Sequence, residues 1–264
     1  MPSLWIGPPG RLRAVDDAAQ EFDRSVSLSV TEFQALGGAV TVTSLPTPPR
    51  RLALSWTGLQ PGDAEWLDAL ARRVFGPSPL AVLDPSTRNL LDGTQSQGFG
   101  PVSSWELTGQ GSLVQQPDRT VTLTGTSSTS VLRWQHPFWP GWPVPAGQRL
   151  TFTTSFPAST SEVQLYWFNA AGLSSWTSRA GATITAEPPD RTLFVKPAIV
   201  PGPLTTPIPV GPALLRLADP TPLPSPLPIG DGCPAMAVTG YTDRPTATAR
   251  DLSLTLVEVR RARS

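Results

Sequence analysis

Residues 163–176 read VQLYWFNAAGLSSW and show the alternation of side chains that decides the fold class of the chain. From residue 163 onward, every second side chain falls on the same face of an extended backbone. One face carries Val163, Leu165 and Trp167, and the other carries Gln164, Tyr166 and Phe168. A period of two is the pattern of a β-strand. The stretch therefore predicts a strand with large aromatic side chains on both of its faces.

Eight short runs of this kind follow residue 88, with Gly, Pro and Ser clusters between them. They are TVTLTG, SVLRW, RLTFTTSF, EVQLYWF, TLFVKPAIV, ALLRLA, MAVTGY and LSLTLVEV. Many short strands at regular spacing are typical of two antiparallel sheets packed face to face. We therefore predict a C-terminal antiparallel β-sandwich, most simply a jelly roll, over residues 91–264.

The first 90 residues predict a second unit, a β-sandwich with one packed α-helix. SVSLSVTEF (25–33) and AVTVTSL (39–45) alternate on either side of a Gly-Gly turn and predict a hairpin. RRLALSW (50–56) predicts a strand with three apolar side chains on one face, and PLAVLDP (79–85) predicts another. The chain as a whole is thus expected to be mainly β, with domains at 1–90 and 91–264.

The one convincing helix is expected in PGDAEWLDALARRVFG (61–76). Asp63 is placed to cap its start and Gly76 to end it. An apolar stripe, which predicts packing on a sheet, consists of Trp66, Leu67, Leu70 and Val74.

Charge and composition exclude several partners. Twenty Lys and Arg residues balance twenty Asp and Glu residues, so no net field favours nucleic acid or an anionic membrane. No apolar run approaches the roughly 20 residues that span a bilayer. The opening MPSLWIGPPGRLRAV does not fit a signal peptide, so we expect synthesis in the cytoplasm without a leader and no membrane insertion.

The sequence offers little material for catalysis or metal binding. Cys233 is the sole cysteine, which excludes an internal disulfide. His136 is the sole histidine, and no Gly-x-Ser-x-Gly elbow accompanies it. Carboxylates weighed for glycoside hydrolysis flank turns, where solvated carboxylates are ordinary: Glu162, Asp190 and Asp231. Candidates for a structural calcium ion are Asp219, Asp231 and Asp251, but no dense acidic loop supports such a site. We therefore expect no enzyme activity, no metal and no cofactor.

The aromatic side chains of WQHPFWPGWPVPAGQRL (134–150) allow three readings. The prolines place Phe138, Trp139 and Trp142 on a loop between two strands. Such a loop can plug the end of a sandwich, form a subunit contact, or present its rings to the apolar faces of sugars. The carbohydrate-binding candidates are Trp139, Trp142, Tyr166 and Trp176.

Residues 37–91 carry a set of features in a particular order: a Gly-Gly turn, an Arg-led strand ending in Trp, a helix, a Gly-Pro-x-Pro strand closing on Asp-Pro, and Asn-Leu-Leu. This order resembles the N-terminal domain of distal tail proteins and related minor tail proteins of actinobacterial phages. The matching positions are Gly37, Gly38, Arg50, Arg51, Trp56, Gly76, Pro77, Pro79, Asp84, Pro85, Asn89, Leu90 and Leu91.

The remaining two thirds look like a carbohydrate-binding-module jelly roll. The resemblance rests on NLLDGTQSQGFGPVSSWELTGQGSL (89–113), VPAGQRLTFTTSF (144–156) and ARDLSLTLVEV (249–259). It implies a fold more than a ligand, because jelly rolls serve unrelated functions.

Together the two resemblances imply a structural protein of a phage, or phage-like, tail tip, located in the virion. Its N-terminal domain would form a homo-oligomeric ring, a hexamer, on the tail tube beside other tail-tip or baseplate proteins, and its jelly roll would face outward. Subunit-interface candidates are Arg50, Arg51, Arg72 and Arg73, for which a solvated basic edge is an equally good interpretation. The alternatives are adsorption to host cell-wall polysaccharide and, behind it, a glycosidase-like enzyme or accessory module.

Overall fold

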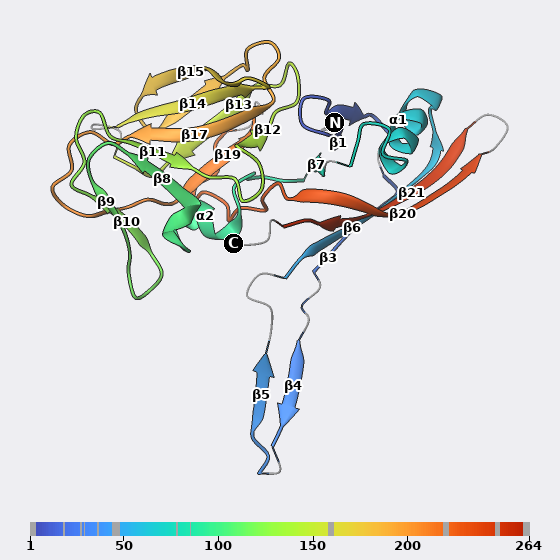
Figure 1. Ribbon diagram of the computed structural model, residues 1–264, viewed down its shortest axis with the longest axis horizontal. Helices are drawn as coiled ribbons and strands as arrows, with labels where there is room; N and C mark the ends of the chain where they lie inside the picture. The colour runs from blue at the N-terminus through green and yellow to red at the C-terminus, as the bar shows by residue number, and fades with distance from the viewer. Residues whose placement is uncertain are drawn as a thin grey trace.

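The computed structural model describes residues 4–17, 19–26, 28, 30–35, 37–43, 48–77, 79–84, 86–157, 161–218, 222–245 and 249–260. The chain is mainly β, as predicted, and its strands form antiparallel sheets around two hydrophobic cores (Figure 1). Among the described residues, no helix is long and apolar enough to cross a membrane.

The first core lies under a seven-stranded antiparallel sheet. Its strands run in the order β2 (Arg13–Val15), β1 (Leu4–Gly7), β7 (Leu80–Leu83), β20 (Ala235–Pro245), β21 (Arg250–Glu258), β6 (Arg50–Leu59) and β3 (Glu21–Val26). On β6, Leu52, Leu54 and Trp56 are buried and the residues between them are not, which confirms the predicted alternation.

Helix α1 (Pro61–Ala71) packs on this sheet against β20 and β21 through Leu67 and Leu70. The expected helix was too long at its C-terminal end: it stops at Ala71, and Val74 lies beyond it, exposed. Asp63 does not cap the helix. Instead it is buried in the first turn, where its carboxylate accepts hydrogen bonds from the Arg13 guanidinium and from the Asp16 backbone.

The membership of this sheet differs from the expected boundary at residue 90. Strands β20 and β21, which we had placed in the jelly roll, lie between β7 and β6. β20 pairs with β7, and β21 pairs with β6. Period-two alternation shows that a segment is a strand but not which strands it pairs with. Residues 91–234 are therefore inserted into a sheet built from both ends of the chain.

The second core lies inside a β-sandwich formed by the inserted segment. One sheet has the order β15 (Gly172–Ala180), β14 (Glu162–Asn169), β17 (Phe194–Val200), β11 (Val131–Trp134) and β8 (Trp105–Thr108), with β12 (Trp142–Pro143) also on β17. Opposite it lies β16 (Thr183–Ala186), β13 (Leu150–Thr154) and β19 (Ala213–Leu217). Trp134 and Phe152 meet between the two sheets, with their ring centroids 5.1 Å apart.

Short elements complete the sandwich. They are α2 (Gly93–Gln97), a 3₁₀ helix η1 (Val102–Ser104), β9 (Ser112–Gln115), β10 (Val121–Thr124) and β18 (Ile208–Pro209). The last three form a small sheet of their own.

Strand β7 joins the two cores. All four of its residues are buried: Leu80 and Val82 point into the first core, and Ala81 and Leu83 into the second. A strand buried on both faces reads as a continuous apolar run, which is what LAVL is. The two halves are therefore packed together through β7.

A two-stranded arm projects from the seven-stranded sheet (Figure 1). It consists of β4 (Thr31–Gln34) and β5 (Val40–Thr43), and the Ala35 amide donates to the Ala39 carbonyl at its turn. The predicted hairpin is thus present, but the run 25–33 is not one strand. Val26 ends β3, in the body, and the arm strand begins at Thr31.

Candidate functional site

The aromatic loop after β11 closes the sandwich. Trp134 and Trp142 are fully buried in the second core, and the Trp142 indole N–H donates to the Leu90 carbonyl at 2.7 Å. Gly141 lies so close to β17 that a Cβ atom there would come within 2.5 Å of the Val195 carbonyl oxygen. Trp142 therefore cannot offer its ring to a sugar, and this carbohydrate-binding candidate is corrected to a core residue.

His136 holds this loop in place. Its Nδ1 accepts the backbone N–H groups of Phe138 and Trp139, both at 3.0 Å. The ring proton therefore sits on Nε2, which lies 2.9 Å from the Cys233 carbonyl and donates to it. The single histidine thus ties the loop to the segment that enters β20, a structural role.

Trp139 is half-buried at the edge of the same loop. Its ring packs on His136 at 5.0 Å, on Phe138 at 5.6 Å and on Phe194 at 6.4 Å between centroids. Contact with three aromatic neighbours, together with its half-burial, reduces the ring face that Trp139 could offer to a sugar.

Tyr166 and Trp176 are brought together on the outward face of the sandwich. They are register partners on β14 and β15, and their rings stack with centroids 6.2 Å apart. Tyr166 is buried beneath this stack and beneath the Arg133 guanidinium, which lies 4.8 Å from its ring centroid. Trp176 is 60% exposed. Of the four carbohydrate-binding candidates, Trp176 is therefore the one that presents an aromatic face to solvent.

A polar cluster next to this stack escaped the sequence analysis. Glu106 on β8 lies 3.7 Å from the Arg133 guanidinium and 3.4 Å from the Lys196 ammonium. Lys196 also donates to the Gln135 side chain at 3.2 Å and lies 5.6 Å from the Phe168 ring. These residues come from four strands and one loop, so no local spacing in the sequence could have grouped them.

The four candidate interface arginines do not form one patch. The Arg50 backbone donates to Glu258, and the Arg50 guanidinium bonds the Asp231 carbonyl, which fixes it within the chain. Arg72 pairs with Asp68 at 3.3 Å, one helical turn before it. Arg51 is exposed at the start of β6, and Arg73 is exposed past the end of α1.

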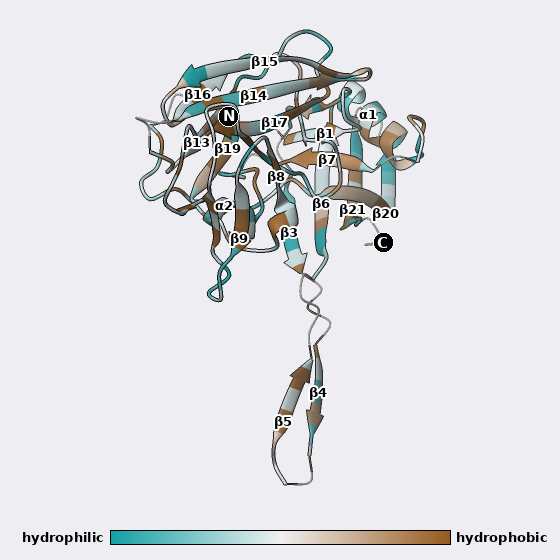
Figure 2. Ribbon diagram, turned by 60° about the vertical axis from the view of Figure 1, so that its left-hand side comes forward, coloured by the Kyte–Doolittle hydropathy of each residue, from teal (hydrophilic) through white to brown (hydrophobic). Residues whose placement is uncertain are grey.

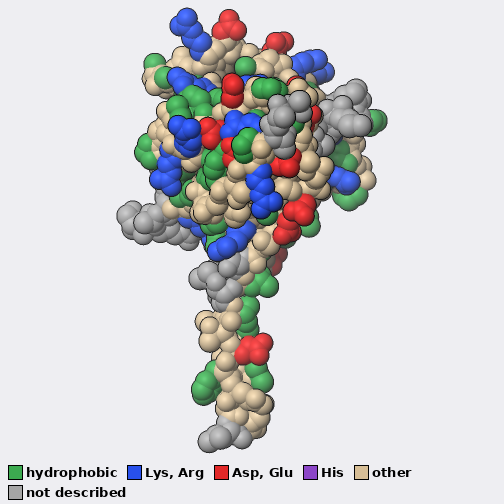
Figure 3. Space-filling model, turned by 90° about the vertical axis from the view of Figure 1, so that its right-hand side faces the viewer, with side chains coloured by type: hydrophobic (Ala, Val, Ile, Leu, Met, Phe, Trp, Pro, Cys, Tyr) green, Lys and Arg blue, Asp and Glu red, His purple; other side chains and the backbone are tan. Residues whose placement is uncertain are grey.

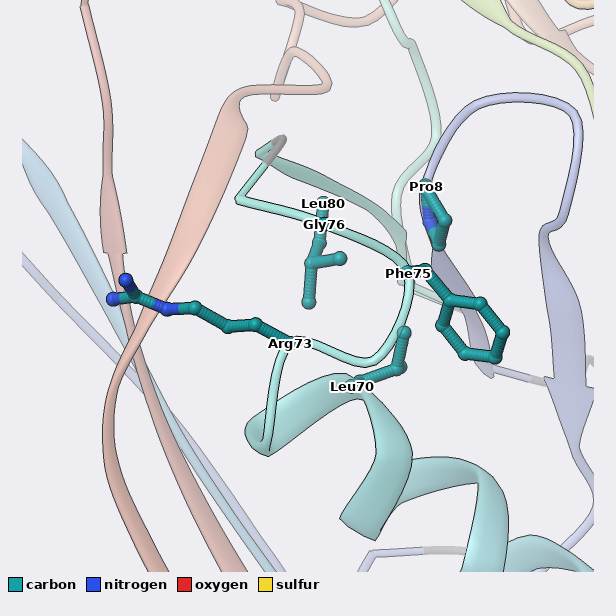
Figure 4. A pocket seen from close by; sticks show the side chains of 6 residues that line it. All are labelled: Pro8, Leu70, Arg73, Phe75, Gly76 and Leu80. Atoms are coloured by element: carbon teal, nitrogen blue, oxygen red, sulfur yellow. The ribbon is translucent and has the colours of Figure 1, made fainter.

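A small hollow lies beside Arg73 (Figure 4). It is lined by Pro8, Leu70, Arg73, Phe75, Gly76 and Leu80. The space holds about one water molecule, which is too small for a substrate.

The carboxylates weighed as calcium ligands are used locally where the structure describes them. Asp231 accepts the Arg88 backbone N–H, and Asp251 accepts that of Gly58. Asp219 and the motif residue Pro85 lie outside the described residues. Within the described part of the chain, no three His, Cys, Asp or Glu side chains are grouped to hold a metal ion.

Exposed apolar side chains gather on the arm and on the segment that leads to it. Thirteen large hydrophobic side chains are exposed among the described residues: Phe33, Val40 and Val42 lie on the arm, Leu28 and Val30 lie between β3 and β4, and Val26 ends β3. Figure 2 colours parts of both arm strands as hydrophobic, and Figure 3 shows hydrophobic side chains on the surface of the arm. The alternation of 25–33 predicted a strand but did not indicate that its apolar side chains would be exposed.

No known protein-family model matches the chain, and no curated protein matches it.

Proposed function

We propose that this protein is a structural component of a phage, or phage-like, tail tip. It would form a ring of identical subunits on the tail tube through the seven-stranded sheet and its arm. The β-sandwich would be displayed outward. The phage context rests on the resemblance of residues 37–91 to distal tail proteins, and the self-association rests on the arm.

The arm carries this proposal because it lacks a core of its own. Every residue of β4 and β5 is exposed, and Phe33 on one face is as open as Val40 and Val42 on the other. An isolated two-stranded hairpin is marginally stable in water. Large apolar side chains left exposed together on one element favour a site of association. The arm therefore requires a second molecule to cover it.

A protruding arm also fits a ring better than a simple pair. An arm that docks on a different surface of its neighbour makes a head-to-tail contact. Head-to-tail contacts repeat from subunit to subunit and close into a ring when the rotation permits. Each subunit then donates one arm and receives one.

The arm can be removed without disturbing the sheet that bears it. Val26 on β3 and Arg50 on β6 are register partners, so an Asn-Gly turn in place of residues 27–49 would join them as a tight hairpin. Light scattering would measure the mass of this variant and of the full chain. We expect a ring-sized oligomer for the full chain and a monomer for the armless variant.

A matched control keeps the arm and alters its polar positions. Thr41→Ser and Thr43→Ser change the same strand, remove only one methyl group each and keep the large apolar side chains, so they should leave the mass unchanged. An oligomer of unchanged mass after removal of the arm would contradict the proposal.

A second candidate function is binding of host cell-wall polysaccharide. The observation in its favour is the exposed ring of Trp176, stacked on Tyr166 beside Arg133. Sugars bind aromatic faces flanked by a few polar groups. In affinity electrophoresis with host-wall glycan, Trp176→Ala should abolish retardation. Phe99→Ala, at another exposed aromatic position, should not.

A further inference from the structure

Strand β15, one of several edge strands in the described part of the chain, has an open outer edge. β15 pairs with β14 on one side and ends the sheet on the other, and no described strand is hydrogen-bonded to that outer edge. Seven of its nine residues are exposed, including Trp176 and Leu173, which is 53% exposed. A long edge strand with exposed apolar side chains is a template for pairing with another chain.

We propose that β4 of one copy pairs with the outer edge of β15 of the next copy, and so extends the sandwich sheet across the subunit boundary. This inference rests on the proposed function, because it names the surface that receives the arm. Pairing would satisfy the backbone N–H and C=O groups on both open edges. It would also cover apolar side chains of both elements.

Charge selects one register for this pairing. Glu32 is the one charged residue in the arm sequence 30–43, and Arg179 is the one charged residue of β15. An antiparallel alignment that sets Glu32 opposite Arg179 also sets Phe33 opposite Ser178. Opposite charges in directly facing positions stabilise a pair of strands.

The same register joins the apolar side chains. Ser178 lies two residues from Trp176, so both side chains are on the same face of β15. Phe33 would then lie diagonal to Trp176 across the new pair, within reach of an aromatic ring. The parallel alignment with the same charge pair would move Phe33 opposite Ala180, away from Trp176. One antiparallel register thus meets both requirements.

These features favour the arm over a sugar as occupant of this edge. A sugar would use the Trp176 ring, but it would leave the strand edge unpaired. In the register above, β4 pairs with residues 177–180 of that edge and buries its own Phe33, which is 67% exposed in the free chain. A four-residue pairing is weak alone, but a closed ring repeats it at every boundary and gains from the high effective concentration of linked sites.

Site-specific crosslinking tests the register. One chain would carry Phe33→Cys and a second, of different mass, Ser178→Cys, both with Cys233→Ala as background. Directly opposite residues have Cβ atoms about 4.5–5.5 Å apart, close enough for a disulfide after small adjustment. We expect a mixed dimer under oxidation. Thr41→Cys, on the far strand of the arm, should give none with Ser178→Cys, because the separation exceeds about 7 Å.

A charge exchange gives an independent readout. Arg179→Glu should shift the oligomer toward smaller species by a factor of at least several in the concentration needed for assembly. Adding Glu32→Arg to the same chain should restore the original value.

The outcomes separate this inference from the proposed function. A ring that needs the arm but gives no Phe33–Ser178 crosslink and no charge rescue overturns the β15 contact and leaves the ring proposal standing. Binding of host-wall glycan that depends on Trp176, without the crosslink, overturns it in favour of a sugar. A monomeric full-length chain overturns both. The mixed dimer together with charge rescue supports the contact.

Discussion

Leu254→Ala tests whether the C-terminal hairpin belongs to the seven-stranded sheet. Leu254 is buried in the first core, and its register partners are Leu54 on β6 and Tyr241 on β20. Truncating a buried leucine to alanine costs about 2–5 kcal/mol, through lost apolar burial and the cavity left behind. Domain stabilities are about 5–15 kcal/mol, so this single change should remove a large part of the total.

The region in which hydrogen exchange changes is more informative than the size of the stability loss. Hydrogen exchange should rise in β6 (50–59), which lies about 200 residues away in sequence but beside β21 in space. Thr255→Ala is the control, because Thr255 lies on the opposite face of the same strand and is only half-buried. If exchange rose within 91–234 and β6 stayed protected, the assignment of β21 to the first core would be refuted.

Three further predictions follow from buried positions. Trp142→Ala should lower the free energy of unfolding by about 3–5 kcal/mol in urea titrations, since it empties a core site and frees the Leu90 carbonyl. Gly141→Ala should cost about 1–3 kcal/mol by the same measurement, because the new Cβ meets the Val195 carbonyl oxygen. Burial raises the pKa of the Cys233 thiol to about 12, so a thiolate-selective reagent at pH 8–9 should label the urea-unfolded chain and leave the native chain unlabelled. The contribution of this buried thiol to the free energy of unfolding is complete below the ordinary thiol pKa of 9.0 and is lost as the pH rises toward 12. Urea titrations should therefore show the free energy of unfolding falling in that pH window.

Local patterns predicted the strands well, because alternation is written in neighbouring residues. The run VQLYWF became β14, with Val163, Leu165 and Trp167 fully buried in the second core. The alternation of residues 50–56 likewise predicted the buried apolar face of β6. Helix α1 was found, but its end was misplaced, because the stripe that predicted it continued to Val74 after the helical hydrogen bonds had stopped.

Non-local pairing could not be predicted in the same way. LSLTLVEV alternates like the other runs, and nothing within it distinguishes a partner in 91–234 from β6. The outward cluster of Arg133, Glu106 and Lys196 could not be predicted from the sequence for the same reason, because its members come from β8, β11 and β17. Trp142 illustrates a third limit: prolines placed it on a loop correctly, but a loop that fills a sandwich end buries its aromatic rings.

The inserted topology bears on how the arm is held. The arm springs from β3 and β6, and β6 reaches the rest of the seven-stranded sheet only through β21. Without β20 and β21, residues 4–90 would leave two separated strand groups, β2-β1-β7 and β6-β3, with no hydrogen-bonded ladder between them. The two strands that bear the arm are therefore joined to the rest of the sheet only after the last strand of the chain is in place. In a ring built from arm-to-sandwich contacts, β3 and β6 set where each arm leaves its subunit, so a chain that lacks β20 and β21 would lack the geometry needed to join one.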